Sequence, residues 1–146
     1  MKKPKALKVK DTIGIVAPAG PVERDKLEKA ISVLKSIGFN TIVGDSCYQH
    51  RGYLARSDML RAQDLHYMFK SDFIDGIICV RGGYGSPRIL QLLDYDMISE
   101  HPKVFIGYSD ITALLTALVQ KSGIVVFHGP MLVSDFLSVS FNKYTK

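Results

Sequence analysis

Short apolar runs alternate with segments of helical periodicity along most of the chain. Five runs have the length and composition of β-strands: residues 12–18, 39–43, 76–80, 104–108 and 124–128. Between them, apolar residues recur three and four positions apart, as on one face of a helix. This alternation predicts an α/β fold, with a doubly wound, mainly parallel sheet of about five strands and flanking helices.

Capping residues mark the predicted helices. Gly38 follows a helical pattern that begins near Leu27, and we expect it to end that helix. Ser57 is expected to cap a second helix. Four apolar residues of that second helix share one face: Met59, Ala62, Leu65 and Phe69.

The length of 146 residues fits one domain with a substantial core, and 47% hydrophobic against 23% charged residues is a globular composition. The net charge of +5 suggests a nucleic-acid partner, but its distribution does not. Five of the 19 basic residues are lysines within the first ten positions, and the other 14 equal the 14 acidic residues. We therefore expect residues 1–10 to be a solvated basic tail, residues 11–130 to form the α/β domain, and no nucleic-acid binding.

Other classes of protein receive little support. No apolar run approaches the length of a membrane span, and residues 12–18 are too short for a signal sequence. Cys47 and Cys79 lack the spacing of metal ligands, and Asp94 and Asp96 are interpreted as helix caps. These observations predict a cytoplasmic protein with neither a metal site nor a membrane partner.

Four segments whose residues could bind a ligand or take part in catalysis follow predicted strands: residues 18–21, 81–86, 107–110 and 128–130. The carboxyl ends of parallel strands open on one edge of a sheet, and ligands bind there. We therefore expect the four segments to converge.

The segment RGGYGS, residues 81–86, is a glycine-rich strand-to-helix loop. Its glycines would let the backbone approach a ligand and direct N–H groups at an anion, and Arg81 could pair with a carboxylate. The alternative is a tight turn that needs glycine only for its backbone angles. Ser86 and Pro87 suit the N-cap and first position of a short helix.

Ser109, in GYSDIT, admits two interpretations. A serine followed by an acid at a helix start is an ordinary N-cap. The rival is a nucleophile elbow, with the N–H of Asp110 as an oxyanion donor, although Ile111 stands where G-x-S-x-G has its second glycine.

A nucleophilic serine needs a base. His128 is the only histidine predicted at the same edge of the sheet, since His50, His66 and His101 fall elsewhere and are expected at the surface. No acid that would orient His128 is identified, and a structural, hydrogen-bonded histidine is the alternative.

Five segments in this order are similar to the N-terminal domain of the LD-carboxypeptidases, a family that includes the microcin-C self-immunity peptidases: DTIGIVAPAGP, RAQDLHYMF, DGIICVRGGYGSPRILQLLDYDMI, KVFIGYSDITALL and VVFHGPM. The resemblance extends from Lys10 to Phe136. RGGYGS, GYSDIT and HGPM together are a specific combination.

The resemblance implies a serine peptidase with a Ser-Glu-His triad that removes the terminal D-alanine from murein tetrapeptides during cell-wall recycling. It places the nucleophile on Ser109 and the oxyanion hole on the backbone N–H groups of Asp110 and Gly83. Substrate contacts are expected from Arg81, Gly82, Tyr84, Gly85, Ser86 and His128. No cofactor is expected, because a charge relay and backbone donors suffice for acyl transfer.

The chain departs from the family pattern in two ways. Ala19 stands where relatives often have serine. The family's glutamate and histidine lie in a second domain, so residues 131–146 are expected to begin a linker towards a C-terminal domain that this chain lacks, and the chain alone is expected to be inactive.

Three alternatives stay open. The chain could be a non-catalytic module that binds a carboxylate or a phosphate, or part of a microcin-C-type immunity peptidase. It could also be a truncated partner of a full-length subunit. A half-protein would expose an apolar face, which predicts self-association as a homodimer.

Overall fold

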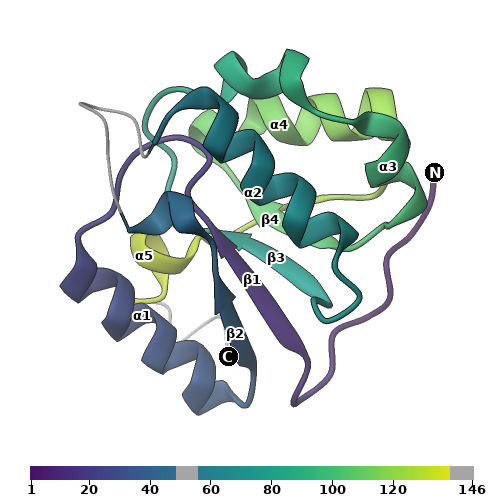
Figure 1. The fold of residues 1–146 in the computed structure, drawn as a ribbon. Helices are drawn as coiled ribbons and strands as arrows, with labels where there is room; N and C mark the ends of the chain where they lie inside the picture. Colours follow the sequence, from purple (N-terminus) through teal and green to yellow (C-terminus); the bar gives the residue numbers. More distant parts are fainter. Residues whose placement is uncertain (49–55, 139–146) are drawn as a thin grey trace.

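The computed structural model describes residues 1–48 and 56–138. Its five strands form one sheet in the order β2-β1-β3-β4-β5, and every neighbouring pair is parallel (Figure 1). The strands are β1 (Thr12–Val16), β2 (Asn40–Val43), β3 (Gly76–Cys79), β4 (Val104–Gly107) and β5 (Phe127–His128). The predicted α/β fold with a parallel five-stranded sheet is confirmed.

Helices connect successive strands. The α-helices are α1 (Arg24–Ile37), α2 (Asp58–Lys70), α3 (Tyr95–Glu100), α4 (Thr112–Ala117) and α5 (Leu132–Asp135). Shorter turns are the 3₁₀ segments η1 (Asp45–Cys47), η2 (Ser86–Leu92) and η3 (Ser109–Ile111), and a π-helical turn, η4 (Leu118–Ser122). Gly38 ends α1 with φ at +115°, and the Ser57 hydroxyl accepts a hydrogen bond from the Leu60 N–H at 3.3 Å, so both predicted caps are confirmed.

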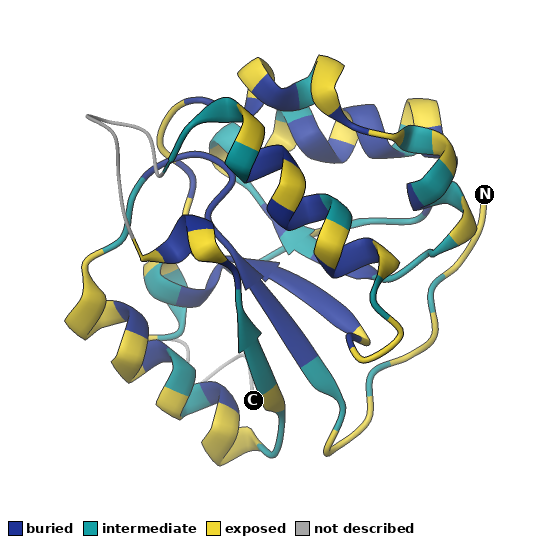
Figure 2. Ribbon diagram, viewed as in Figure 1, coloured by how far each residue is buried: buried dark blue, intermediate teal, exposed yellow. Residues whose placement is uncertain are grey.

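Two hydrophobic cores lie on opposite faces of the sheet. Helices α1 and α5 cover one face, and α2, α3 and α4 cover the other (Figure 1). Successive residues of β3 alternate between the cores: Ile77 and Cys79 face α2 and α4, while Ile78 faces α1. β1 and β3 are therefore almost wholly buried, and β2 is only half-buried (Figure 2). A sheet covered on both faces explains why its central strands are continuous apolar runs.

The buried face of α2 differs from the face expected. Met59 is 59% exposed, whereas Arg61 and Asp64 are buried among Ala62, Leu65 and other apolar residues of the helix. The expected helix after the glycine loop is also shifted by one residue. Gly85 is its N-cap, and Ser86 is its first residue.

The basic N-terminal segment is held against the domain at its start. The Lys2 N–H donates to the Gly123 carbonyl at 2.8 Å, and the Val125 N–H donates to the Lys2 carbonyl at 2.9 Å. The Lys2 Nζ donates to the Ser99 carbonyl at 2.7 Å. Most of residues 1–10 are exposed, but Lys2 is not free in solvent as a tail residue would be.

The segment after residue 130 begins with α5, which packs on α1. The Val133 N–H donates to the Val80 carbonyl at 2.9 Å. The segment 131–138 thus contacts the carboxyl end of β3, and its role as the start of a linker stays a prediction. Across residues 1–48 and 56–138, no helix is long and apolar enough to span a membrane.

Candidate active site

The four loops expected to converge do meet at the carboxyl edge of the sheet. The Gly20 N–H donates to the Gly82 carbonyl at 3.0 Å, which joins the loop after β1 to the glycine loop. The Gly129 N–H donates to the Gly107 carbonyl at 3.2 Å, which joins the loops after β5 and β4. The prediction drawn from strand polarity alone is confirmed.

Ser109 adopts a backbone conformation that serine rarely takes. Its φ is +58°, and among the described residues only Lys10 is another non-glycine residue with positive φ. A left-handed conformation costs a non-glycine residue about 1–3 kcal/mol and is concentrated at functional sites. An N-cap has extended backbone angles, but here Tyr108 takes that place, and among residues 1–48 and 56–138 no N–H donates a capping hydrogen bond to the Ser109 hydroxyl. The N-cap interpretation is wrong. The exposed hydroxyl sits on a sharp strand-to-helix turn, as in a nucleophile elbow.

The glycine loop lies directly against this turn. A Cβ atom on Gly82 would come within 3.1 Å of the Ser109 Cβ and 3.3 Å of the Asp110 nitrogen. Gly83 follows with φ at +110°, a conformation that side chains disfavour. Within residues 1–48 and 56–138, no atom accepts a hydrogen bond from the Gly83 N–H. The tight-turn interpretation is confirmed by the positive φ of Gly83 and Gly85, whereas the approach of this loop to a ligand stays a prediction.

Ile111 takes the place of the second glycine of G-x-S-x-G without obstructing the turn. It is fully buried, and it packs over Gly107 at the end of β4. A Cβ on Gly107 would lie only 2.5 Å from the Ile111 Cγ2 atom. The missing Cβ at Gly107 therefore makes room for the isoleucine.

Ser86 and Asp110 connect the glycine loop to the turn at Ser109. The Ser86 N–H donates to the Asp110 carboxylate at 2.9 Å, and the Ser86 hydroxyl donates to the Asp110 carbonyl at 2.5 Å. Ser86 is completely buried. Its hydroxyl is used to hold the loop in place, and the predicted contact between Ser86 and substrate stays a prediction.

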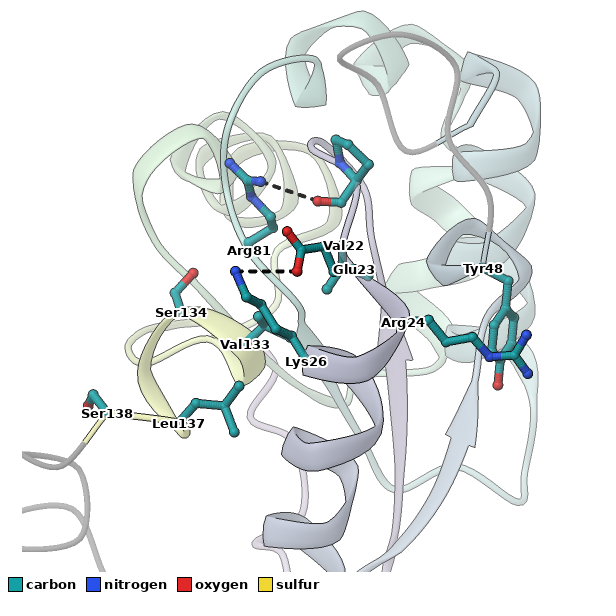
Figure 3. A pocket seen from close by; sticks show the side chains of 11 residues that line it. Val22, Glu23, Arg24, Lys26, Tyr48, Arg81, Val133, Ser134, Leu137 and Ser138 are labelled. Carbon is teal, nitrogen blue, oxygen red and sulfur yellow. Dashed lines mark hydrogen bonds and ion pairs between the residues drawn. The ribbon is translucent and has the colours of Figure 1, made fainter.

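Arg81 borders a cavity of about 830 Å³ (Figure 3). Its Nη1 donates to the Pro21 carbonyl at 3.3 Å. Other polar residues of the lining include Glu23, Arg24, Lys26, Tyr48 and Ser134. Lys26 pairs with Glu23 at 3.6 Å, and the Arg24 guanidinium lies over the Tyr48 ring. Neither Ser109 nor Gly82 lines this cavity, so it lies beside the Ser109 turn without containing it.

His128 lies next to Gly107 in the register of β4 and β5, and it is exposed. Its ring meets the Tyr108 ring edge-on at a centroid distance of 6.0 Å. The Tyr108 hydroxyl donates to Asp135 at 3.2 Å, and burial together with that carboxylate raises the pKa of Tyr108. Among the described residues, no hydrogen bond joins the Ser109 hydroxyl to His128. A Ser109–His128 pair is not formed here.

The other histidines have structural contacts or lie outside the described residues. The His66 Nε2 accepts a hydrogen bond from the Asp94 N–H at 2.9 Å, and the His101 Nδ1 is 2.9 Å from the Met97 carbonyl oxygen. His50 falls in residues 49–55, which the structure does not describe. Asp94 caps α3 by accepting from the Met97 N–H, as expected.

Arg61 is the residue of this region that the sequence interpretation missed. It is completely buried on α2, and its Nη1 donates to the Pro18 carbonyl at 2.6 Å and to the Gly85 carbonyl at 2.9 Å. Counting back from Leu65 in steps of four would have placed position 61 on the buried face. A charged residue at such a position is unusual unless it is paired.

The described part of the chain has no group of three or more histidine, cysteine, aspartate or glutamate side chains placed to hold a metal ion. Cys47 and Cys79 are unpaired and buried, and burial raises the pKa of both thiols. Neither is a reactive thiolate at neutral pH.

These features define an α/β domain that presents a serine on a strained strand-to-helix turn, beside a glycine loop. The sequence profile of the LD-carboxypeptidase N-terminal domain matches residues 13–129. The chain belongs to this family.

Individual relatives agree with the family assignment. The chain is 46% identical over 133 residues to a probable murein peptide carboxypeptidase of Bacillus subtilis (91% of this chain, 42% of that protein). It is 35% identical over 133 residues to the microcin C7 self-immunity protein MccF of Escherichia coli (89% of this chain, 39% of that protein). The crystal structure of an MccF-like protein from Bacillus anthracis superposes with a TM-score of 0.90 at 34% identity, over 95% of this chain and 43% of that one. The chain spans only about two fifths of the length of these relatives.

Proposed function

We propose that the full-length protein is a serine LD-carboxypeptidase, which removes the terminal D-alanine from murein tetrapeptides in the cytoplasm during cell-wall recycling. The observation that carries the proposal is the left-handed backbone of Ser109, with its hydroxyl exposed at the carboxyl edge of the sheet. The name of the Bacillus subtilis relative gives the class of substrate.

In this mechanism, the Ser109 Oγ attacks the carbonyl carbon of the peptide bond to D-alanine, and a base takes the hydroxyl proton. The negative charge that forms on the carbonyl oxygen is stabilised by the N–H groups of Asp110 and Gly83. The C–N bond then breaks, and the base returns the proton to the amino group of the departing D-alanine. Water hydrolyses the acyl-enzyme and regenerates Ser109.

The base and its orienting acid are a histidine and a glutamate of a second domain, as the family resemblance implies. The absence of a Ser109–His128 hydrogen bond among the described residues supports a base from elsewhere. His128 then lies at the edge of the site, beside Tyr108, where it contacts substrate.

The negative charges of a murein peptide suit the side of the site near Arg81. Arg81 is exposed and borders the 830 Å³ cavity, with its guanidinium directed at the Pro21 carbonyl (Figure 3). Its fork of donors matches a carboxylate. Arg81 and Tyr84 accordingly bind the peptide, while Gly82 and Gly85 shape the loop.

The test is hydrolysis of murein tetrapeptide by the full-length protein and its Ser109→Ala variant. We expect the variant to lose activity by several orders of magnitude, because no other group supplies the nucleophile. Ser32→Ala, on the exposed side of α1, is the matched control and should keep the wild-type rate. Unchanged turnover by Ser109→Ala would exclude the proposed mechanism.

The similarity to MccF favours one alternative, a microcin-C-type immunity peptidase that acts on an aminoacyl nucleotide. The two substrates separate the candidates when both are offered to the same preparation. Faster cleavage of the aminoacyl nucleotide than of murein tetrapeptide would favour the immunity function. Calorimetric binding of nucleotides without peptide binding or hydrolysis would instead indicate a non-catalytic module.

A further inference from the structure

Arg61 is the one fully buried arginine among the described residues, and its guanidinium reaches three separate segments. Nη1 donates to the carbonyls of Pro18 and Gly85, and Nε donates to the Arg56 carbonyl at 3.1 Å. Nη2 pairs with Asp58. Burying a charge is costly unless it is paired and fully hydrogen-bonded, and each nitrogen of this guanidinium has a partner.

Two of those partners belong to loops that form the candidate site. Pro18 begins the loop after β1, and Gly85 lies in the glycine loop. The same loops are also joined by the Gly20–Gly82 hydrogen bond. Gly82 in turn lies against Ser109. Arg61 thus hydrogen-bonds to both loops, and it reaches Ser109 only indirectly, through Gly82 of the glycine loop.

The charge on Arg61 is balanced locally. Asp58 accepts from Arg61 and also from the partly exposed Arg88, whose Nε lies 3.0 Å away. The Arg88 hydrogen bond holds the pKa of Asp58 below its usual range. Arginine remains protonated at any pH near neutral, so the hydrogen bonds of Arg61 to the two loops do not depend on its titration.

We propose that Arg61 is a positioning residue. Its guanidinium binds the Pro18 and Gly85 carbonyls and so holds the Gly82–Gly83 turn at the distance from Ser109 that oxyanion binding requires. The inference rests on the proposed function, and it assigns to Arg61 no contact with substrate. A lysine at this position has one nitrogen and cannot reproduce a planar fork that reaches several carbonyls.

The test compares Arg61→Met, Arg61→Lys and the control Arg88→Met in the full-length protein. Arg88→Met removes the exposed partner of Asp58 but leaves every Arg61 bond to the loops intact. We expect Arg61→Met to lower kcat by about 10- to 100-fold, because a displacement of an oxyanion donor by an ångström has effects of this size. KM should stay within about threefold, Arg61→Lys should be intermediate, and Arg88→Met should match the wild type.

A second measurement separates positioning from loss of fold. A tripeptide boronic acid forms a tetrahedral adduct with the serine, whereas the tripeptide product does not. We expect Arg61→Met to weaken boronate binding by the same factor as kcat/KM and to leave product binding unchanged. If both affinities fell together, or if kcat were unchanged in a folded variant, the inference would be wrong. Should Arg61→Met fail to fold, a wild-type kcat for Arg61→Lys would overturn the inference in the same way.

A third measurement does not depend on hydrolysis. Amide hydrogen exchange of residues 81–86 should accelerate in Arg61→Met and Arg61→Lys, and not in Arg88→Met, because the loop loses its fastening. Unchanged exchange would overturn the role of Arg61 even if the wild-type protein cleaved no peptide. A failure of the proposed function and a failure of this inference are therefore distinguishable.

Discussion

Close contacts require glycine at three positions in and around the turn at Ser109. Gly82 lies against Ser109 and Asp110, Gly107 lies beneath Ile111, and Gly20 lies against the Gly82 carbonyl. A side chain at any of these three glycines would displace a neighbour rather than fill open space. The turn can take this shape only because the three glycines have no Cβ atom.

Gly82→Ala should impair catalysis more than folding. The new Cβ would lie 3.2 Å from the Ser109 Oγ and 3.3 Å from the Asp110 nitrogen, so the nucleophile or its oxyanion donor must shift. We expect kcat/KM of the full-length protein to fall by about 10- to 100-fold, since small misplacements have effects of this size.

Gly123→Ala is the control for that substitution. Gly123 also has a positive φ, +65°, but a Cβ there would meet nothing within 4 Å. We expect a loss of about 1 kcal/mol in the free energy of unfolding, measured by urea titration, and an unchanged rate of hydrolysis. Equal losses of activity in both variants would contradict the steric explanation.

At the scale of elements, the sequence pattern predicts the strands well where both neighbours are regular. β1, β3 and β4 begin at the expected residues and end one or two residues early. β5 is reduced to Phe127–His128, because β4 offers only Ile106 and Gly107 as partners, and Ile124 pairs with Lys2 instead. The pairing of Lys2 with Ile124 joins residues far apart in the sequence, which no local pattern reveals.

The junction of β4 with the following helix depends on the fit between Gly107 and Ile111. Gly107→Ala places a Cβ 2.5 Å from the Ile111 Cγ2 atom and should lower the free energy of unfolding by about 1–3 kcal/mol through overpacking. Ile111→Ala should cost about 2–5 kcal/mol through the cavity it creates. The measurement is urea unfolding of both single variants and of the double variant.

We expect the double variant to be clearly less destabilised than the sum of its parts, because removing the isoleucine also removes the clash. Additive effects would show that the two side-chain positions do not compete for the same space. The junction would then owe its geometry to some other contact.

The described part of the molecule is a sheet covered by helices on both faces (Figure 1). The loops of the candidate site lie together at the carboxyl edge of this sheet. The turn at Ser109 and the glycine loop belong to this chain, and so do the oxyanion donors that the proposal names. The base that the proposed mechanism requires does not come from His128 as the described residues are arranged. In the proposed mechanism that base comes from a second domain, which stays a prediction.

Residues 1–146 produced alone should hydrolyse murein tetrapeptide at a rate orders of magnitude below that of the full-length protein, because binding and oxyanion contacts without a base retain little catalysis. Circular dichroism and thermal unfolding must first show that the isolated chain is folded. A folded chain with a rate within about tenfold of the full-length protein would show that its own residues complete the site.

The fold class, the polarity of the strands and the convergence of four loops could all be predicted from the amino-acid sequence alone. Each of these follows from short-range periodicity and from the rule that parallel strands end on one edge. The Gly38 and Ser57 caps were predictable for the same reason, since a cap is a contact between neighbours in the chain.

The local sequence could not separate the two interpretations of Ser109, and it is the folded backbone that excludes the N-cap. The positive φ of Ser109 occurs in a turn where Ile111 packs on Gly107 and where Ser86, 24 positions away from Asp110, bonds to that aspartate. Likewise, Arg61 is buried because carbonyls of distant loops accept from it, although its residue type alone indicates a surface position. A local sequence pattern reflects interactions between neighbours in the chain. The conformation at Ser109 and the burial of Arg61 instead involve contacts between residues far apart in the sequence, which such a pattern does not contain.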